Sequence, residues 1–267
     1  QEDIAHLMVG HQGHGGVGIE LLRAVGQHRH AQIEGREQHV EQAADPGPVR
    51  GRPDDVARLA QQVVAQAAQG PLILTNAGNA SIRHDSNYLN PLGNTLNSTE
   101  AANFYLTKPF VDFLKSTNDP RLSAIAVRYV GAKSGPEQQP INASFDPNLQ
   151  IGMPMGNDNA GAVQVAADLG LASFYDFSQV DRRRVAKITA PGFMVTASQT
   201  NLLLAEARQR GWITTGTAAG YFEAGVRAHM IQMALHDQAS TIPAADIDAY
   251  ITANPLVDAT ALQQLIQ

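Results

Sequence analysis

The stretch from Phe193 to Leu235 constrains the fold most strongly, because it reads as two amphipathic helices joined by a short Thr- and Gly-rich turn. One stripe of the first helix holds, at helical spacing, Thr200, Leu203, Leu204, Ala207 and Gly211. The second helix carries a bulky stripe of Phe222, Val226, Met230 and Met233 beside a small-residue stripe of Ala218, Gly225 and Ala228. Because small residues let two helices approach closely, the pattern predicts an antiparallel helical hairpin.

Glycines mark both the end of the first helix and the packed side of the second. Gly211 follows two arginines, so the first helix is expected to end there with a positive φ at the glycine. Trp212 is then expected to fold back over the end of the hairpin. Gly220 and Gly225 each cost about 1 kcal/mol inside a helix relative to Ala, so close packing is expected to compensate at both.

Composition narrows the class of protein. The net charge of −6 and pI near 5.8 argue against nucleic acid as the main partner, since phosphate binding favours a basic surface. No stretch approaches the roughly 20 apolar residues of a membrane-spanning helix. The chain has no cysteine, which excludes disulfides, thiolate metal sites, a Cys nucleophile and a lipid-attachment cysteine within it.

The first part of the chain has an unusual composition. Residues 1–74 contain no Ser, Thr, Asn, Lys, Phe, Tyr or Trp, yet they hold six of the nine histidines. A normal domain seldom excludes so many residue types over this length. We therefore leave residues 1–54 unassigned, and we hypothesise that they are a misread reading frame or a disordered segment.

An alternative function rests on this same segment. Gly13, Gly15 and Gly18 have the G-x-G-x-x-G form between a strand-like and a helix-like stretch, as in loops that bind the pyrophosphate of a dinucleotide. They would make the chain a nucleotide-dependent enzyme, although no further β-α-β units follow. The histidine pairs of this segment lack a third ligand, so no metal site is expected.

From Pro53 onward the pattern predicts a mainly helical chain. Helices are expected at residues 53–70, 107–115, 243–251 and 259–266, and a strand at residues 124–130. Pro71–Asn79 is expected to be extended, and residues 81–100 to be polar loop in which Thr99 caps the next helix. No nucleophile elbow and no H-E-x-x-H sequence occurs, so neither catalytic residues nor a cofactor is expected.

Residues 131–192 are rich in Gly, Pro and Asn and low in periodicity, which predicts a long loop of functional importance. The candidate ligand-binding residues are its aromatic side chains, namely Phe145, Phe174, Tyr175 and Phe177. Such rings stack on the apolar faces of sugars while polar neighbours bind hydroxyl groups. The alternative is that the rings pin the loop to the helices. The run from Arg182 to Arg184 is expected to be solvated or ion-paired.

Several short motifs occur together in a recognisable order. They are Asn76-Ala-Gly-Asn79, Asn118-Asp-Pro-Arg-Leu122, Ala205-Glu-Ala207, Arg210-Gly-Trp212 and Tyr221-Phe-Glu-Ala-Gly-Val-Arg-Ala228. In this combination the chain resembles the SusD/RagB-type nutrient-binding outer-membrane lipoproteins, in their divergent SusD-like branch. The resemblance covers residues 55–267 and implies a helical domain, incomplete at both ends. It also implies a mainly α fold of tetratricopeptide-like hairpins with long irregular loops and little β structure.

The resemblance further implies a non-catalytic role. By analogy the protein would lie at the bacterial outer membrane through a lipid anchor that this chain does not contain. It would capture an oligosaccharide or another nutrient and deliver it to a SusC-like TonB-dependent transporter. A third hypothesis, besides the nucleotide-dependent enzyme, is a helical-repeat interaction scaffold that binds no small ligand.

Overall fold

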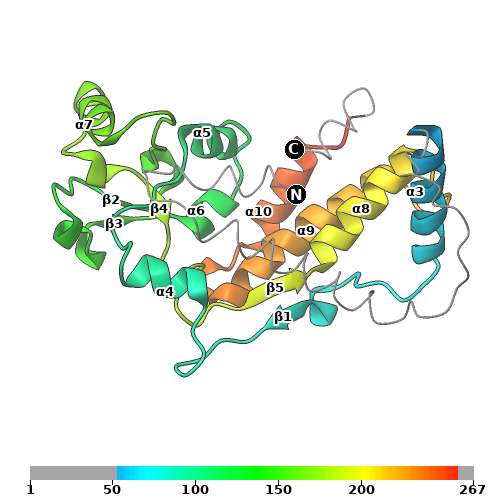
Figure 1. Cartoon of the computed structure of the whole chain (residues 1–267). Coiled ribbons are helices and arrows are strands. Elements are labelled where there is room, and N and C mark those ends of the chain that lie inside the picture. Colours follow the sequence, from blue (N-terminus) through cyan, green and yellow to red (C-terminus); the bar gives the residue numbers. More distant parts are fainter. Residues whose placement is uncertain (1–52, 258–267) are drawn as a thin grey trace, which may run out of the picture. The chain divides into compact units, whose positions relative to one another are not determined.

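The computed structural model describes residues 53–257, and within them residues 59–257 belong to one compact unit (Figure 1). The α-helices are α3 (Pro53–Ala67), α4 (Pro91–Asn97), α5 (Lys108–Ser116), α6 (Arg121–Ile125), α7 (Asn159–Asp168), α8 (Ala197–Gln209), α9 (Ala218–His236) and α10 (Ala244–Ala253). The expected mainly helical fold is confirmed. The glycine loop at Gly13, Gly15 and Gly18 and the helix expected at residues 259–266 lie outside the described residues.

The strands are short and form two small antiparallel sheets. They are β1 (Ala80–Ile82), β2 (Ala126–Tyr129), β3 (Ala143–Ser144), β4 (Gln179–Val180) and β5 (Gly192–Val195). Strands β1 and β5 pair with each other, and β2 lies between β3 and β4. No helix in the described part of the chain is both long and apolar enough to cross a membrane.

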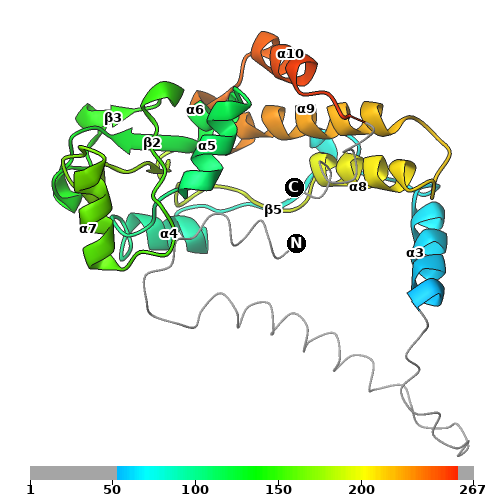
Figure 2. The same cartoon turned by 90° about the horizontal axis from the view of Figure 1, so that it is seen from above.

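The predicted hairpin is present as α8 and α9, which lie side by side in both views (Figures 1 and 2). A capping box starts α8, because Thr196 Oγ1 accepts from the Gln199 N–H while the Gln199 side chain accepts from the Thr196 N–H. At the other end Gly211 has φ 72°, and the N–H of Trp212 donates to the carbonyl of Ala207 at 2.8 Å. This Schellman geometry confirms the predicted helix end.

Two asparagines tie the hairpin to the segment before β1. The Asn76 side chain donates to the carbonyl of Ala228 in α9 at 2.9 Å. Asn79 accepts from the backbone N–H of Ala197, the first residue of α8, at 2.8 Å. An N–H in the first turn of a helix has no partner within the helix, so this bond satisfies a group that would otherwise need water.

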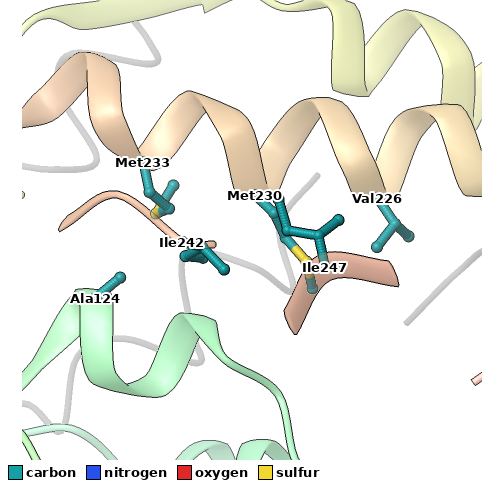
Figure 3. Packing of buried hydrophobic residues seen from close by; sticks show 6 residues of the cluster. All are labelled: Ala124, Val226, Met230, Met233, Ile242 and Ile247. Atoms are coloured by element: carbon teal, nitrogen blue, oxygen red, sulfur yellow. The ribbon is translucent and has the colours of Figure 1, made fainter. Parts of the chain in front are cut away.

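The bulky stripe of α9 builds one hydrophobic core (Figure 3). Val226, Met230 and Met233 pack there against Ala124 of α6 and against two residues near the end of the described chain, Ile242 and Ile247. Gly225, on the small-residue stripe, lies against α8, since a Cβ at this position would come within 2.8 Å of Leu202 Cγ. Close packing therefore explains Gly225.

Two expectations about the hairpin were wrong. The side chain of Leu203 is 65% exposed, because α9 and the segment before β1 cover the side of α8 that carries Asn201 and Leu204 instead. Gly220 does not pack against α8. It lies in the first turn of α9, where its N–H donates to the Thr217 side chain that caps the helix.

The loops were expected to be longer than they are. Helix α4 interrupts residues 81–100, with Asn90 accepting from the N–H of Gly93 as its N-cap and Pro91 in its first turn. Helix α7 interrupts residues 131–192, with Asp158 as N-cap. Thr99 follows α4 and caps no helix, and α6 replaces the start of the strand expected at residues 124–130. By contrast, α5 begins after Thr107 as predicted.

A polar junction connects α6, α9 and α10. The guanidinium of Arg121 donates to both carboxylate oxygens of Asp119 and, through Nη1, to His229 Nδ1 at 2.9 Å. It also lies over the Tyr250 ring, 5.8 Å from the centroid. Because a guanidinium can only donate, His229 must be neutral at Nδ1. Burial, and then the positive charge of Arg121, lower the pKa of His229 to about 4.

Substituting Gly225 with valine tests the close approach of α8 and α9. Gly225→Val places methyl groups against Leu202, so it should lower the free energy of unfolding by about 1–3 kcal/mol. Ala224→Val adds the same β-branched side chain at the neighbouring exposed position and serves as control. Urea denaturation of both variants measures the difference. Equal losses in the two variants would contradict the packing.

Acid stability tests the junction at His229. Its pKa is lower in the folded than in the unfolded chain, so the unfolded chain binds more protons below pH 6.5. The free energy of unfolding should be highest above pH 6.5, and it should decrease by about 3 kcal/mol as the pH is lowered to 4. His229→Gln keeps an acceptor for Arg121 but does not titrate, so denaturation curves from pH 7 to pH 4 should show a shallower loss in this variant. His236, whose pKa burial also lowers, keeps part of the slope.

Candidate functional site

One face of the β3–β2–β4 sheet gathers aromatic and arginine side chains. Val127 and Tyr129 of β2 lie on the same face because side chains alternate along a strand. Ala143 is paired with Tyr129, and Phe145 directly follows β3, where the guanidinium of Arg184 lies over its ring. Tyr175 packs on the same cluster. We call Phe145, Phe174, Tyr175, Arg182 and Arg184 the aromatic face, together with the buried Tyr129, over which Arg182 lies.

Phe145 is held from one side by an arginine. The guanidinium of Arg184 lies over the Phe145 ring, 4.1 Å from its centroid, while the side chain of Phe145 remains 41% exposed. Arg184 forms an ion pair with Asp181 and donates to the carbonyls of Ser123 and Ala239. Because these bonds fix the guanidinium, the ring keeps a defined orientation and an open surface.

Phe174 and Tyr175 belong to the short 3₁₀ helix η6 (Phe174–Asp176), which Ser173 caps by accepting from the N–H of Tyr175. Their ring centroids are 4.1 Å apart, and Phe174 also makes an edge contact with Tyr105. Both side chains are half-buried. They are therefore pinned to the core on one side and accessible on the other.

Phe177, a candidate ligand-binding residue from the sequence, is a core residue in the structure. Its side chain is 0% exposed and packs in a cluster with Tyr105 and Ala166. A ligand at the surface cannot reach a ring that protein atoms cover on all sides. The alternative interpretation, in which a ring pins the loop, is therefore correct for Phe177.

A polar network that the sequence did not reveal lies beside the rings. Arg182 donates to the side-chain oxygens of Gln179, at 3.0 Å, and Gln138, at 3.4 Å, and it lies over the Tyr129 ring. Gln138 in turn donates to the Tyr175 carbonyl and to the hydroxyl of Tyr105. Burial raises the pKa of the Tyr105 hydroxyl, which stays protonated. Within the arginine run, Arg184 therefore forms an ion pair with Asp181. Arg182 is half-buried and donates hydrogen bonds to two glutamines.

This surface is suited to non-covalent contacts with a ligand. It offers half-exposed rings for stacking, with amide and guanidinium groups nearby for hydrogen bonds. Of the carboxylates nearby, Asp181 binds Arg184 and Asp176 binds Arg128 at 2.9 Å, whereas the exposed Asp146 accepts from the N–H of Asn148. Among the side chains that the structure describes, in residues 57–257, no group of three or more His, Asp or Glu is placed to hold a metal ion.

Residues 51–266 match the model of a SusD-like family described as starch-binding and associating with the outer membrane. Solved structures have a similar fold. A chitin-binding protein is 26% identical with a TM-score of 0.63, and the match covers 78% of this chain and 42% of that one. A SusD-like protein from Bacteroidetes is 18% identical with a TM-score of 0.61, covering 79% and 50%.

A SusD homologue from Bacteroides fragilis is 22% identical with a TM-score of 0.54, covering 75% of this chain and 42% of that one. The chain therefore spans half or less of the length of these three structures. No curated protein matches the chain. The likeness in fold agrees with the expected tetratricopeptide-like helical architecture.

Truncating two phenylalanines tests which of the two rings belongs to the core and which lies at the surface. Phe177→Ala should cost about 3–5 kcal/mol of unfolding free energy, because it leaves a cavity in the buried cluster. Phe145→Ala should cost less than about 1 kcal/mol, because its ring is half-exposed. Thermal and urea denaturation of the two variants check the difference. Similar losses would show that Phe145 is as integral to the core as Phe177.

Proposed function

Because the chain belongs to the SusD-like family, we propose that its function is to bind an oligosaccharide or another nutrient without transforming it. The observation that carries the proposal is the aromatic face. Phe145 presents an open ring backed by Arg184, and Phe174 and Tyr175 present a second pair of half-exposed rings. The three accessible rings come from the loop residues in which the sequence predicted ligand contacts.

A pyranose ring matches this surface chemically. Its apolar C–H face can stack on Phe145 or Tyr175, and its hydroxyl groups can exchange hydrogen bonds with amide and guanidinium groups at the rim. The rings are already oriented by Arg184 and by the capped η6 helix. Binding therefore loses little side-chain entropy, which favours affinity.

The state of the carboxylates supports a binding role over a catalytic one. Hydrolysis of a glycosidic bond uses two carboxyl groups on either side of the bond, one of which must release and accept protons. Two acids beside the aromatic face, Asp181 and Asp176, are instead buried and paired with arginines. Protein atoms cover both carboxylates and arginines occupy their oxygens, so neither is placed at the surface to reach a glycosidic bond.

The cellular role follows from the same family assignment. We place the protein at the bacterial outer membrane, anchored by lipid, with a SusC-like TonB-dependent transporter as its partner. In this role it would capture the nutrient and release it to the transporter. The family description supports the membrane association, and co-purification of the tagged chain with a transporter barrel would test the partner.

Calorimetric titration tests ligand binding at the aromatic face. Maltoheptaose and chitohexaose are suitable probes, since the family is described as starch-binding and one similar structure is a chitin-binding protein. The wild-type chain should bind at least one probe, and Phe145→Ala or Tyr175→Ala should weaken binding about tenfold, or about 1.4 kcal/mol. Phe113→Ala removes an exposed ring on α5 that is not part of the aromatic face, and it should leave the affinity unchanged.

A further inference from the structure

A tyrosine outside the aromatic face is unusually exposed for its size. Tyr88 lies in the loop between β1 and α4, which extends beyond the strands at the lower edge of Figure 1. Its side chain is 58% exposed, the largest exposed fraction of any aromatic residue in the described part of the chain. Exposure alone is common at a protein surface, so the question is whether the ring is held in a fixed orientation in which a ligand could use it.

The loop that carries Tyr88 is rigid, although it lies at the surface. The carboxylate of Asp85 accepts from the N–H groups of Asn87 at 2.7 Å and Tyr88 at 2.9 Å, and the Asp85 N–H donates to the Tyr88 carbonyl. These backbone bonds lower the pKa of the Asp85 carboxyl. At its far end the loop is anchored through Asn90, whose side chain donates to the carbonyl of Ala190 at 3.0 Å.

The Tyr88 ring has one covered and one open face. His84 stacks on it with ring centroids 5.0 Å apart and an interplanar angle of 29°. His84 is itself held from two sides, by the carbonyl of Tyr88 at 3.2 Å and by the β1–β5 pair, where Gly192 approaches its ring. Within the described residues the Tyr88 hydroxyl has no hydrogen-bond partner, so both the open face and the hydroxyl are available to a ligand.

We propose that the Tyr88 loop is a second contact site for carbohydrate, at which the open ring face takes a neutral pyranose of an oligosaccharide. The inference rests on the proposed function and adds to it a site on a different sheet, β1–β5. The stack of Tyr88 on His84 presents an aromatic platform like that of Phe145 on Arg184. A ligand of several sugar units gains affinity from two platforms when its length spans both, because the second contact is then made at high effective concentration.

The surroundings of the ring favour a sugar over a protein partner. The core of a protein interface is apolar and depleted in charge. Within the loop, Tyr88 is instead surrounded by the exposed side chains of Arg83, Asp85, Ser86 and Asn87. These groups supply donors and acceptors for sugar hydroxyls around a single ring.

Fluorine NMR gives a readout local to Tyr88. The full chain is labelled with 3-fluorotyrosine, and the resonance that disappears in Tyr88→Phe is assigned to Tyr88 among the six tyrosines. Addition of chitohexaose or maltoheptaose should shift this resonance. The titration curve of the shift should give the same dissociation constant as calorimetry. Probe binding that leaves the Tyr88 resonance unmoved would overturn the inference. A resonance that moves with protein concentration and not with the probe would assign Tyr88 to a protein contact and would also overturn it.

Affinities of matched variants separate this site from the proposed function. Tyr88→Ala should weaken binding of the probe about tenfold, whereas Tyr88→Phe, which keeps the ring, should weaken it less than about threefold. Asp85→Ala should fall between them, because it loosens the loop and keeps the ring. Binding that depends on Phe145 but not on Tyr88 would overturn this inference alone. Binding of neither probe by the wild-type chain would count against the proposed function itself.

Discussion

The close contact between α8 and α9 at Gly225 holds the rest of the described structure in place. One side of α9 is committed to this contact, and the bulky stripe on its other side builds the core with α6 and α10. Arg184 reaches the carbonyls of Ser123 in α6 and Ala239 after α9, so the support under Phe145 depends on how that core is assembled. The orientation of Arg184 and Phe145 at the surface thus depends on the helix packing at Gly225.

The helices with clear caps and periodicity could be predicted from the sequence. The ends of α8 follow from Thr196 and Gly211, whose local signals need no tertiary information. Helices α4 and α7 were missed because their signals are small. Both begin at Asn or Asp, residues that are equally common in turns, and neither has a strong apolar period. The strands are two to four residues long, which is too short for a period of two to be recognised.

The candidate site could be predicted by residue type but not by arrangement. Phe145, Phe174 and Tyr175 were identified as accessible rings in a polar loop, whereas the burial of Phe177 depends on helix α7, which the sequence did not reveal. The polar partners join residues distant in the chain, since Arg182 reaches Leu96 and Gln138 reaches Tyr175. Contacts of this kind leave no local pattern. Tyr88 was missed for a related reason, because its loop reads as ordinary turn sequence.

The position of Arg184 has a consequence for how such a protein can diversify. All of its hydrogen-bond partners lie outside residues 131–150, the segment that brings Phe145 to the surface. That segment can therefore change in length and composition while the guanidinium beneath it stays where it is. In a family with this arrangement, substitutions and insertions in this loop can change the ligand preference while the arginine and the helices that hold it stay the same.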